Sequence, residues 1–553
     1  MTEQSLKVIP LGGLGAIGKN MMVLEYGKAL LVIDAGLMFP DDDMLGIDLV
    51  LPDYSYLVEN KERVLGIILT HGHEDHVGAL PYLLKEVDTP VYGTKLTLGL
   101  VNSKLGEHGL QGKVSLNEVS SAKPLTLGPF TLEFLEVSHS IPDGVGLGIH
   151  TPVGTIVHTG DFKLDQTPID NRPTAMQRFA ELGSKGVLLL MSDSTNADIP
   201  GFTTPERTVG RALEGIFALA PGRVIVASFA SHIHRIQQVM DVAASHGRSL
   251  AVIGRSMVKN VNIAQNLGYL KVPDGLLIKP HDIALLPPDR VAILSTGSQG
   301  EPLSALARIA SRDHPLVDII KGDTVVISAR AVPGNETSVY RTIDRLFAAG
   351  ARVIYEHSAG VHVSGHAAAE ELKVMLNLVR PKYFMPVHGE HRHMHFHSEL
   401  ATATGIPAEN VFLLENGDVL ELNKDSAGIV GKVQAGMTLV DGFAMGDLRD
   451  LVLRDRQHLA NDGLVIIVVA RSAQDGQIVG DLEVVFRGFA HAGDIDELTE
   501  KAKQRVMEAL AGEELTQVSD ITVVKTRVHD VLQKFLHKEV GRRPMVLPVI
   551  VEV

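Results

Sequence analysis

The sequence predicts a multidomain α/β protein, on three observations. Its 553 residues exceed what one compact core usually holds and favour about two to four domains. Short apolar, β-branched runs that end in Gly, Asp or His recur through the first 200 or so residues, as buried strands with polar ends do in layered α/β folds. From about Thr204, helical periodicity alternates with strand patterns, which is typical of a second unit built on a parallel sheet.

The elements follow from these patterns in chain order. In the first part we expect strands at 6–11, 29–36, 64–73, 91–94, 130–139, 154–161 and 186–194. In the second part we expect helices at 206–220 and 234–247 and strands at 223–230, 249–254, 291–298 and 324–334. The earlier pattern returns at 382–391 and 410–422, and the last part alternates strands at 464–472, 482–489 and 545–553 with helices at 497–512 and 527–540.

This return of the first pattern predicts one domain inserted in another. The predicted boundaries are 1–205 and 370–425 for a discontinuous first domain, 206–369 for the insert, 426–450 for a linker and 451–553 for a small C-terminal α/β domain. The C-terminal domain has no cluster of catalytic residue types, so we expect it to serve assembly or RNA contact rather than chemistry.

Composition restricts the chemistry that is possible. With no cysteine, the chain has no disulfide and no thiolate ligand, so a metal must be held by histidine, carboxylate or backbone oxygen; the sequence has 24 histidines. The start has no basic and apolar leader, and no apolar run approaches the length of a membrane span, so we expect a cytoplasmic protein without a membrane role.

A net charge of −15 argues against binding a polyanion over the whole surface. A nucleic-acid partner would need a local basic face, and residues 206–260 are the candidate. They contain seven Lys or Arg (Arg207, Arg211, Arg223, Arg235, Arg248, Arg255 and Lys259) and three acids (Glu206, Glu214 and Asp241). Ordinary charge on helix surfaces is the competing interpretation.

A glycine pattern near the start imitates a nucleotide-binding loop. Gly13, Gly15 and Gly18 follow a strand, and Asp34 lies about 20 residues further on, as the dinucleotide fingerprint requires. That fingerprint also needs a helix after its third glycine, whereas Lys19 leads into MMVLEYG, a strand pattern. We therefore expect a tight loop between strands that borders a site.

The strongest chemical signal is the run Thr70-His-Gly-His-Glu-Asp-His76, directly after a predicted strand. His71 and His73 can point to one side of an extended backbone, and Asp75 with His76 begins the next element. Four ligand-type side chains within six residues predict a metal site.

Three further residues close other apolar runs: His139, Asp161 and His388. Together with the run they supply seven nitrogen and oxygen ligands, enough for two ions that share one residue, and Asp161 with two oxygens is the natural bridge. Two divalent ions about 3.5–4 Å apart can activate a bridging hydroxide and clamp a phosphate oxygen.

This set resembles the metallo-β-lactamase superfamily. The resemblance implies an αββα sandwich, a first ion on His71, His73, His139 and Asp161, and a second on Asp75, His76, Asp161 and His388. Asp193, His366 and His388 look like the three motifs of the β-CASP nucleases, a branch with an inserted domain. His366 is then expected to protonate the leaving oxygen, and the expected catalytic residues are Asp75, Asp193 and His366.

Over essentially its whole length the chain resembles the bacterial ribonuclease J family. This implies a 5′-to-3′ exoribonuclease favouring 5′-monophosphate ends, with endonuclease activity, in mRNA decay and rRNA maturation. It also implies zinc, with manganese as alternative, single-stranded RNA and other RNA-decay proteins as partners, a homodimer or homotetramer, and a structural calcium for which Asp48 and Asp441 are candidates.

Two segments offer hydroxyl, amide and imidazole donors for phosphate: Ser228, Ser231, His232 and Ile233, and His362, Val363, Ser364, Gly365 and His366. His391, His393, His395 and His397 are expected on a helix surface, without a role.

Three alternative functions stay open: a β-CASP nuclease of other specificity (DNA or RNA 3′-end processing), a catalytically silent RNA-binding scaffold, and a small-molecule hydrolase.

Overall fold

The computed structural model describes residues 5–41, 43–301, 303–332, 335–355, 359–442, 444–446, 450–473, 477–488, 495–511 and 521–553. The chain divides into two compact units, Met1–Asp41 with Asp48–Val440, and Asp42–Ile47 with Asp441–Val553. Within the described residues, no helix combines the length and apolarity needed to span a bilayer.

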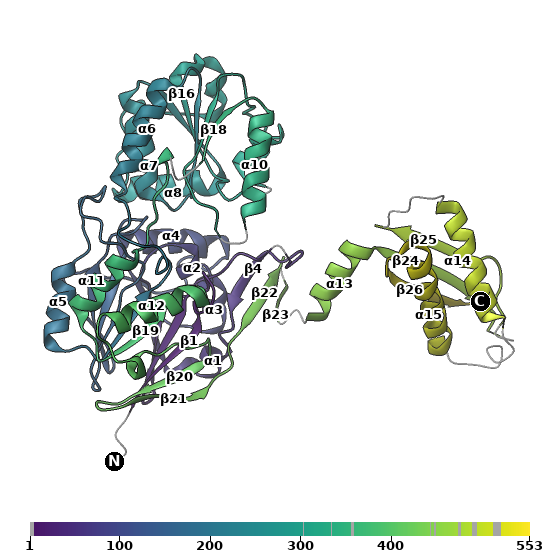
Figure 1. Cartoon of the computed structure of the whole chain (residues 1–553), viewed down its shortest axis with the longest axis horizontal. Helices are drawn as coiled ribbons and strands as arrows, with labels where there is room; N and C mark the ends of the chain where they lie inside the picture. Colours follow the sequence, from purple (N-terminus) through teal and green to yellow (C-terminus); the bar gives the residue numbers. More distant parts are fainter. Residues whose placement is uncertain are drawn as a thin grey trace. The chain divides into compact units, whose positions relative to one another are not determined.

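Two sheets packed face to face form the core of the first unit (Figure 1). One has the strand order β21-β20-β1-β2-β3-β5-β6-β7. Its strands are β1 (Leu6–Gly12), β2 (Met21–Tyr26), β3 (Ala29–Ile33), β5 (Val64–Ile68), β6 (Val91–Gly93), β7 (Leu116–Glu118), β20 (Asp418–Leu422) and β21 (Ala427–Lys432). The other has the order β19-β12-β11-β10-β9-β8. Its strands are β8 (Leu125–Leu127), β9 (Phe130–Glu136), β10 (Val145–His150), β11 (Thr155–His158), β12 (Leu189–Asp193) and β19 (Tyr383–Val387). Buried side chains of both sheets, such as Leu24 and Leu147, meet in one hydrophobic cluster.

Helices cover the outer face of each sheet. The first sheet packs against α1 (Ser55–Glu59), α2 (Glu74–Val77), α3 (Leu80–Glu86) and α4 (Lys95–Glu107). The second packs against α5 (Met176–Lys185), α11 (Ala369–Val379) and α12 (His391–Ala403). This arrangement confirms the αββα sandwich, and the chain completes both sheets only after it has left and returned.

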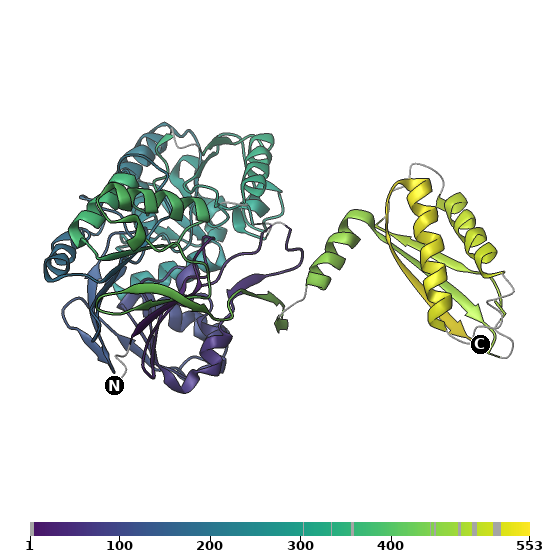
Figure 2. The same ribbon diagram turned by 60° about the horizontal axis from the view of Figure 1, so that its bottom comes forward.

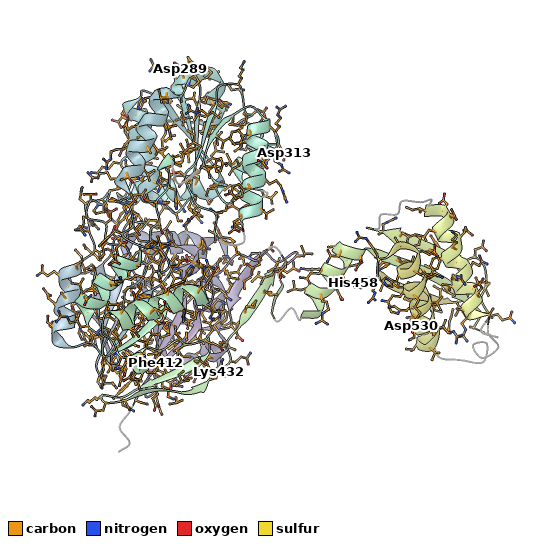
Figure 3. The ribbon with its side chains drawn as sticks, viewed as in Figure 1. Asp289, Asp313, Phe412, Lys432, His458 and Asp530 are labelled. Carbon is orange, nitrogen blue, oxygen red and sulfur yellow. The ribbon has the colours of Figure 1, made fainter. Side chains whose placement is uncertain are left out.

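The inserted segment is a separate three-layer α/β fold (Figure 1). Its parallel sheet has the order β15-β14-β16-β13-β17-β18. The strands are β13 (Val224–Ala227), β14 (Ser249–Ile253), β15 (Leu277–Ile278), β16 (Val291–Ser295), β17 (Thr324–Ile327) and β18 (Arg352–Ile354). One face carries α6 (Arg207–Leu219), α7 (Ile233–Ser245) and α8 (Arg255–Leu267), and the other carries α9 (Ala305–Ala310) and α10 (Glu336–Ala348). Exposed acids such as Asp289 and Asp313 lie on the outer surface of this insert (Figure 3).

The second unit is a small α/β fold. A sheet of order β25-β24-β26 packs on two helices that lie side by side (Figure 2). The elements are β23 (Ala444–Gly446), α13 (Asp450–Asp462), β24 (Leu464–Arg471), β25 (Glu483–Arg487), α14 (Ile495–Leu510), α15 (Ile521–Val540) and β26 (Met545–Glu552).

The stretch 426–450, which we expected to be a linker, differs from that expectation. β21 pairs with β20, and β22 (Met437–Asp441) pairs with β4 (Leu49–Pro52). Residues up to Val440 therefore belong to the compact first unit, because backbone pairing with the neighbouring β20 and with the distant β4 orders them. A second difference is the start of α15, which lies six residues before the helix expected at 527–540.

Candidate metal centre

The strand ends bring the predicted ligands together at one edge of the two core sheets. His71 and His73 lie between β5 and α2, and His139 follows β9. Asp161 follows β11, and His388 follows β19 directly, with a left-handed φ of 53°. The ligand atoms fall into groups in which all atoms lie within 4.8 Å of one another, namely His71, His73 and His139, and Asp75, His76, Asp161 and His388.

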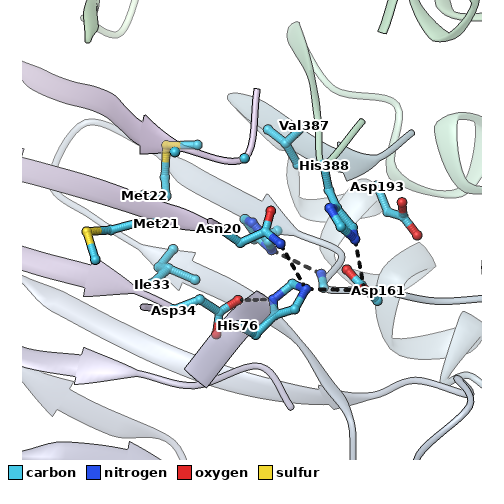
Figure 4. Close-up of a pocket in the computed structure, with 14 residues that line it drawn as sticks. Asn20, Met21, Met22, Ile33, Asp34, His76, Asp161, Asp193, Val387 and His388 are labelled. Atoms are coloured by element: carbon cyan, nitrogen blue, oxygen red, sulfur yellow. Dashed lines mark hydrogen bonds and ion pairs between the residues drawn. The ribbon is translucent and has the colours of Figure 1, made fainter. Parts of the chain in front are cut away.

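One carboxylate oxygen, Asp161 Oδ2, is the centre of the arrangement (Figure 4). It lies 3.1 Å from His388 Nε2 and 3.2 Å from His76 Nε2. His71 Nε2 lies 3.7 Å away and His139 Nε2 3.9 Å away. Four imidazole nitrogens thus converge on a single oxygen, the geometry expected of a shared ligand.

His73 and Asp75 contact the histidines around Asp161 Oδ2. His73 Nδ1 lies 3.0 Å from His71 Nε2 and 3.2 Å from His139 Nε2. Asp75 Oδ2 lies 3.5 Å from His76 Nε2 and 3.7 Å from His388 Nε2. All seven side chains expected at this site therefore lie close together, with the carboxylate of Asp161 between the three histidines of one group and the other members of the second.

The electrostatics fit divalent cations. Burial, together with neighbouring imidazoles, holds the pKa of His71 and His73 well below the ordinary value, and burial with His366 lowers the pKa of His139 to about 3. Their rings are neutral, which leaves lone pairs for a metal. Burial disfavours the Asp161 anion, but the imidazoles of His388 and others outweigh it and lower its pKa. On the other side of the centre, burial disfavours the cations of His76 and His388, but Asp161 outweighs it and raises the pKa of both rings, so a metal ion bound there would displace their protons. Imidazole nitrogens around an anionic carboxylate are a donor set that divalent ions accept.

Asp34 was not expected at this site, although it closes β3 with φ 61°. Its carboxylate accepts from the Thr70 backbone N–H and hydroxyl, both at 2.8 Å, and lies 2.7 Å from His76 Nδ1. Figure 4 shows His76 between Asp34 and Asp161. Asp34 thereby fixes the ring so that Nε2 faces the centre, as an outer carboxylate does for a metal-binding histidine. The sequence feature that could have indicated this role is a carboxylate directly after a buried strand, the same feature that predicted the ligands.

Asn20 and His158 also border the site without having been expected. Asn20 Nδ2 donates to the backbone oxygen of Asp75 at 3.0 Å and lies 3.1 Å from His76 Nε2. His158 Nδ1 accepts from the Gly160 N–H at 3.0 Å, and burial lowers its pKa to about 4. Both stabilise the turns that carry ligands.

His366 and Asp193 form a pair beside the centre. His366 Nδ1 lies 2.7 Å from Asp193 Oδ2, and the ring centroid lies 4.8 Å from that of His139 and 5.5 Å from that of His388. Burial alone would lower the pKa of His366, but Asp193 outweighs it and raises the pKa to about 9. The imidazole therefore holds a proton at neutral pH, and its side chain keeps 19% of its surface exposed.

The two segments predicted to bind phosphate differ in what they expose. Ile233 and Val363 are packed in the hydrophobic core of the insert, so only their backbone groups could touch a ligand. The His232 ring is buried and accepts from the Arg235 N–H at 3.2 Å, as the N-cap of α7. Ser228 is buried as well, while Ser231 is partly exposed.

In the second segment, His362 is partly buried. Ser364 Oγ accepts from Asn196 Nδ2 at 2.8 Å and from the His366 N–H at 3.2 Å. The Gly365 oxygen lies 2.8 Å from His139 Nδ1. This turn is therefore bound to the metal centre itself.

The predicted basic face at 206–260 is wrong for three of its seven cations. Arg223, Arg235 and Arg248 are buried. Arg235 pairs with Glu206 at 2.7 Å, and Arg223 pairs with Asp323 at 2.6 Å. Charge counted along the sequence does not distinguish an arginine inside the insert from one on its surface.

Other expectations have mixed outcomes. The glycine loop joins the antiparallel strands β1 and β2, so a nucleotide fingerprint is excluded as expected, and Gly13 lines the pocket beside Asp34 and His76. His393 and His397 are buried in α12 rather than on its surface, and His397 Nδ1 lies 3.0 Å from Ser194 Oγ.

The candidate cation ligands stay a prediction. Asp441 forms an ion pair with Arg456, and Asp48 is exposed. Neither belongs to a potential metal-holding group among the residues that the structure describes.

An αββα sandwich with clustered His and Asp side chains at its strand ends, interrupted by an α/β insert, defines a metallo-β-lactamase-type hydrolase of the β-CASP branch. Family models match the chain in order: the metallo-beta-lactamase superfamily (14–199), the ribonuclease J beta-CASP domain (221–346), the Zn-dependent metallo-hydrolase RNA specificity domain (351–413) and the ribonuclease J C-terminal domain (451–553). The chain belongs to the ribonuclease J family.

Curated relatives are similar over full length. Ribonuclease J 1 of Streptococcus pyogenes serotype M3 is 44% identical, covering 100% of this chain and 99% of its own. Ribonuclease J2 of Bacillus subtilis is 43% identical (100% and 99%), and ribonuclease J of Thermus thermophilus is 44% identical (100% and 96%). A crystal structure of a protein of unknown function from Enterococcus faecalis V583 is similar in fold alone, with 16% identity and a TM-score of 0.51, covering 76% of this chain and 100% of that one.

Proposed function

We propose that this chain is a two-metal ribonuclease that hydrolyses phosphodiester bonds of single-stranded RNA at the centre around Asp161. The observation that carries the proposal is the convergence of four imidazole nitrogens on Asp161 Oδ2, within 3.9 Å, with a protonated histidine beside them. A scaffold that only binds RNA would have no use for seven intact ligand side chains.

The proposed ligands are His71, His73, His139 and Asp161 for one ion, and Asp75, His76, Asp161 and His388 for the other. Two divalent ions held there would polarise the phosphate and lower the pKa of water between them. Zinc is the proposed metal and manganese the alternative, because an all-nitrogen and oxygen site accepts both. Asp34 acts through His76, whose ring it orients.

His366 is the proposed general acid. Its Nδ1 is bonded to Asp193, which leaves Nε2 to donate a proton to the departing oxygen. Asp193 stabilises the imidazolium before transfer and keeps the ring in one orientation. The lowered pKa of His139, which is buried, and the raised pKa of His366 assign different tasks to two neighbouring imidazoles.

We infer the direction of cleavage and the preferred RNA end from membership of the ribonuclease J family. We propose 5′-to-3′ exonuclease action that prefers a 5′-monophosphate, together with endonuclease cleavage, in mRNA decay and rRNA maturation in the cytoplasm. Backbone amides, hydroxyls and imidazoles at 228, 231–233 and 362–366 are the proposed phosphate contacts. The second unit is proposed to assemble the chain into a homodimer or homotetramer, alone or with other RNA-decay proteins.

One RNA tests these points together. The same oligonucleotide carrying a 5′-monophosphate, triphosphate or hydroxyl is digested after chelation and re-addition of zinc, manganese or magnesium. We expect fastest degradation of the monophosphate with zinc or manganese and none without metal. His76→Ala should abolish cleavage while the circular dichroism spectrum stays unchanged; normal turnover by that variant, or by the chelated enzyme, would exclude the proposed centre. Faster digestion of a matched DNA would indicate another β-CASP specificity.

A further inference from the structure

The chain crosses between the core sandwich and the insert twice, and the second crossing carries His366. On its insert side, the backbone oxygen of Val361 accepts from Ser328 Oγ at 2.6 Å and from Arg235 Nη1 at 3.1 Å. Both partners belong to the insert. The residues before His366 are therefore fixed to the parallel sheet and α7.

Within three residues the partners change to the core. The oxygen of Ser364 accepts from Lys163 Nζ at 3.2 Å, and that of Gly365 lies 2.8 Å from His139 Nδ1. The Ala367 N–H donates to the Phe162 oxygen at 2.7 Å. His366 thus lies on the core side of the boundary, although it follows the insert in sequence.

Two side chains hold the backbone of His366 directly. Its oxygen accepts from Thr203 Oγ1 at 2.7 Å and from Asn196 Nδ2 at 3.1 Å. Asn196 also donates to Ser364 Oγ at 2.8 Å. Both residues lie on the outgoing crossing, so the outgoing and returning segments are joined at the residue proposed as the acid.

Glu371 also joins the outgoing and the returning segment. Its carboxylate, which is buried, accepts from the backbone N–H of Thr203 at 2.6 Å, of Ala368 at 2.8 Å and of Leu164 at 2.8 Å. Leu164 lies three residues after Asp161. We call Asn196, Thr203 and Glu371 the clasp.

We infer that Thr203 and Asn196 are positioning residues for His366, and that the clasp holds this imidazole beside Asp193 and the metal centre. The inference rests on the proposed function of His366. Neither residue needs to touch the RNA, so the clasp acts on the chemical step and not on binding.

Thr203→Val removes the hydroxyl and keeps the branched shape. We expect kcat to fall about tenfold or more while KM for RNA stays unchanged, because a small displacement of a reacting group is costly to the rate. Thr203→Ser should recover most of the loss, and Thr203→Ala is a second variant in case the valine disturbs packing. Thr208→Val is the matched control, since its hydroxyl also donates to a backbone oxygen at 2.7 Å, that of Pro205, without contact to His366.

A double-mutant cycle with His366→Ala separates this inference from the proposed function. We expect Thr203→Val to have no further effect on kcat once His366 is alanine. If His366→Ala turns over as fast as the wild type, the acid role fails and the clasp fails with it. If His366→Ala is slow but Thr203→Val keeps full kcat, or slows the alanine variant as much as the wild type, only the clasp is overturned.

Discussion

Gly365→Ala perturbs the metal centre through a single methyl group. A Cβ at Gly365 would lie 2.7 Å from Cε1 and 2.8 Å from Nδ1 of His139, whereas an ordinary contact begins near 3.4 Å. The backbone at Gly365 does not have a left-handed φ, so the alanine itself adds no conformational strain. His139 is buried, and its ring must therefore retreat by roughly 0.7 Å within the site.

The size of the effect follows from that displacement. His139 Nε2 lies 3.2 Å from His73 Nδ1 and 3.9 Å from Asp161 Oδ2, so a shift of this size misplaces one of the four ligands proposed for this ion. Misplacement of a reacting group by about 1 Å costs up to about a hundredfold in rate. We expect Gly365→Ala to lower kcat about ten- to a hundredfold and to weaken retention of one metal ion.

The assay is single-turnover cleavage of a labelled RNA, with the metal content measured on the same sample after gel filtration. Gly215→Ala is the matched control: Gly215 lies in α6 with no atom near the added Cβ, and alanine there should stabilise by up to about 1 kcal/mol without an effect on cleavage. Wild-type kcat and metal content in Gly365→Ala would refute the placement of His139 against this turn.

Three further changes test other parts of the site. Asp161→Asn removes the shared carboxylate and should abolish cleavage with the fold intact by circular dichroism; substantial turnover would contradict its role. Asp193→Asn removes the charge that raises the pKa of His366, and a proton donor loses activity as pH rises through its pKa, so the alkaline limb of the kcat profile should move to lower pH; an unmoved limb would argue against the acid. Arg235→Met leaves the Glu206 carboxylate buried without its cation and should cost about 3–5 kcal/mol in urea unfolding, and a loss below about 1 kcal/mol would show that the pair is dispensable.

The ligands could be predicted from the sequence because each closes an apolar strand. Strands in adjacent layers bring such ends to one edge, so His139, Asp161 and His388 join the 71–76 run despite their separation. Asp34 follows β3 in the same way, but its spacing of about 20 residues from the glycine pattern also fits a nucleotide fingerprint, which hides its relation to the metal site. The rule of polar strand ends applied to every strand would have found it.

Burial and long-range pairing could not be predicted in the same way. Arg235 is a cation in sequence, yet it lies on the inner side of α7, where Glu206 and backbone oxygens surround it. Residues 427–441 have the composition of a linker. Part of this stretch forms a hairpin with β20, and the rest pairs with β4, a strand far away in the chain. The contacts of the clasp could not be predicted from the sequence either, because its partners are backbone atoms on a distant segment.

Anomalous diffraction from crystals grown with manganese or zinc tests the central claim most directly. We expect two peaks about 3.5–4 Å apart on either side of Asp161, one among His71, His73 and His139 and the other among Asp75, His76 and His388. A single peak in fully active crystals, or metal bound away from these side chains, would contradict the two-metal account.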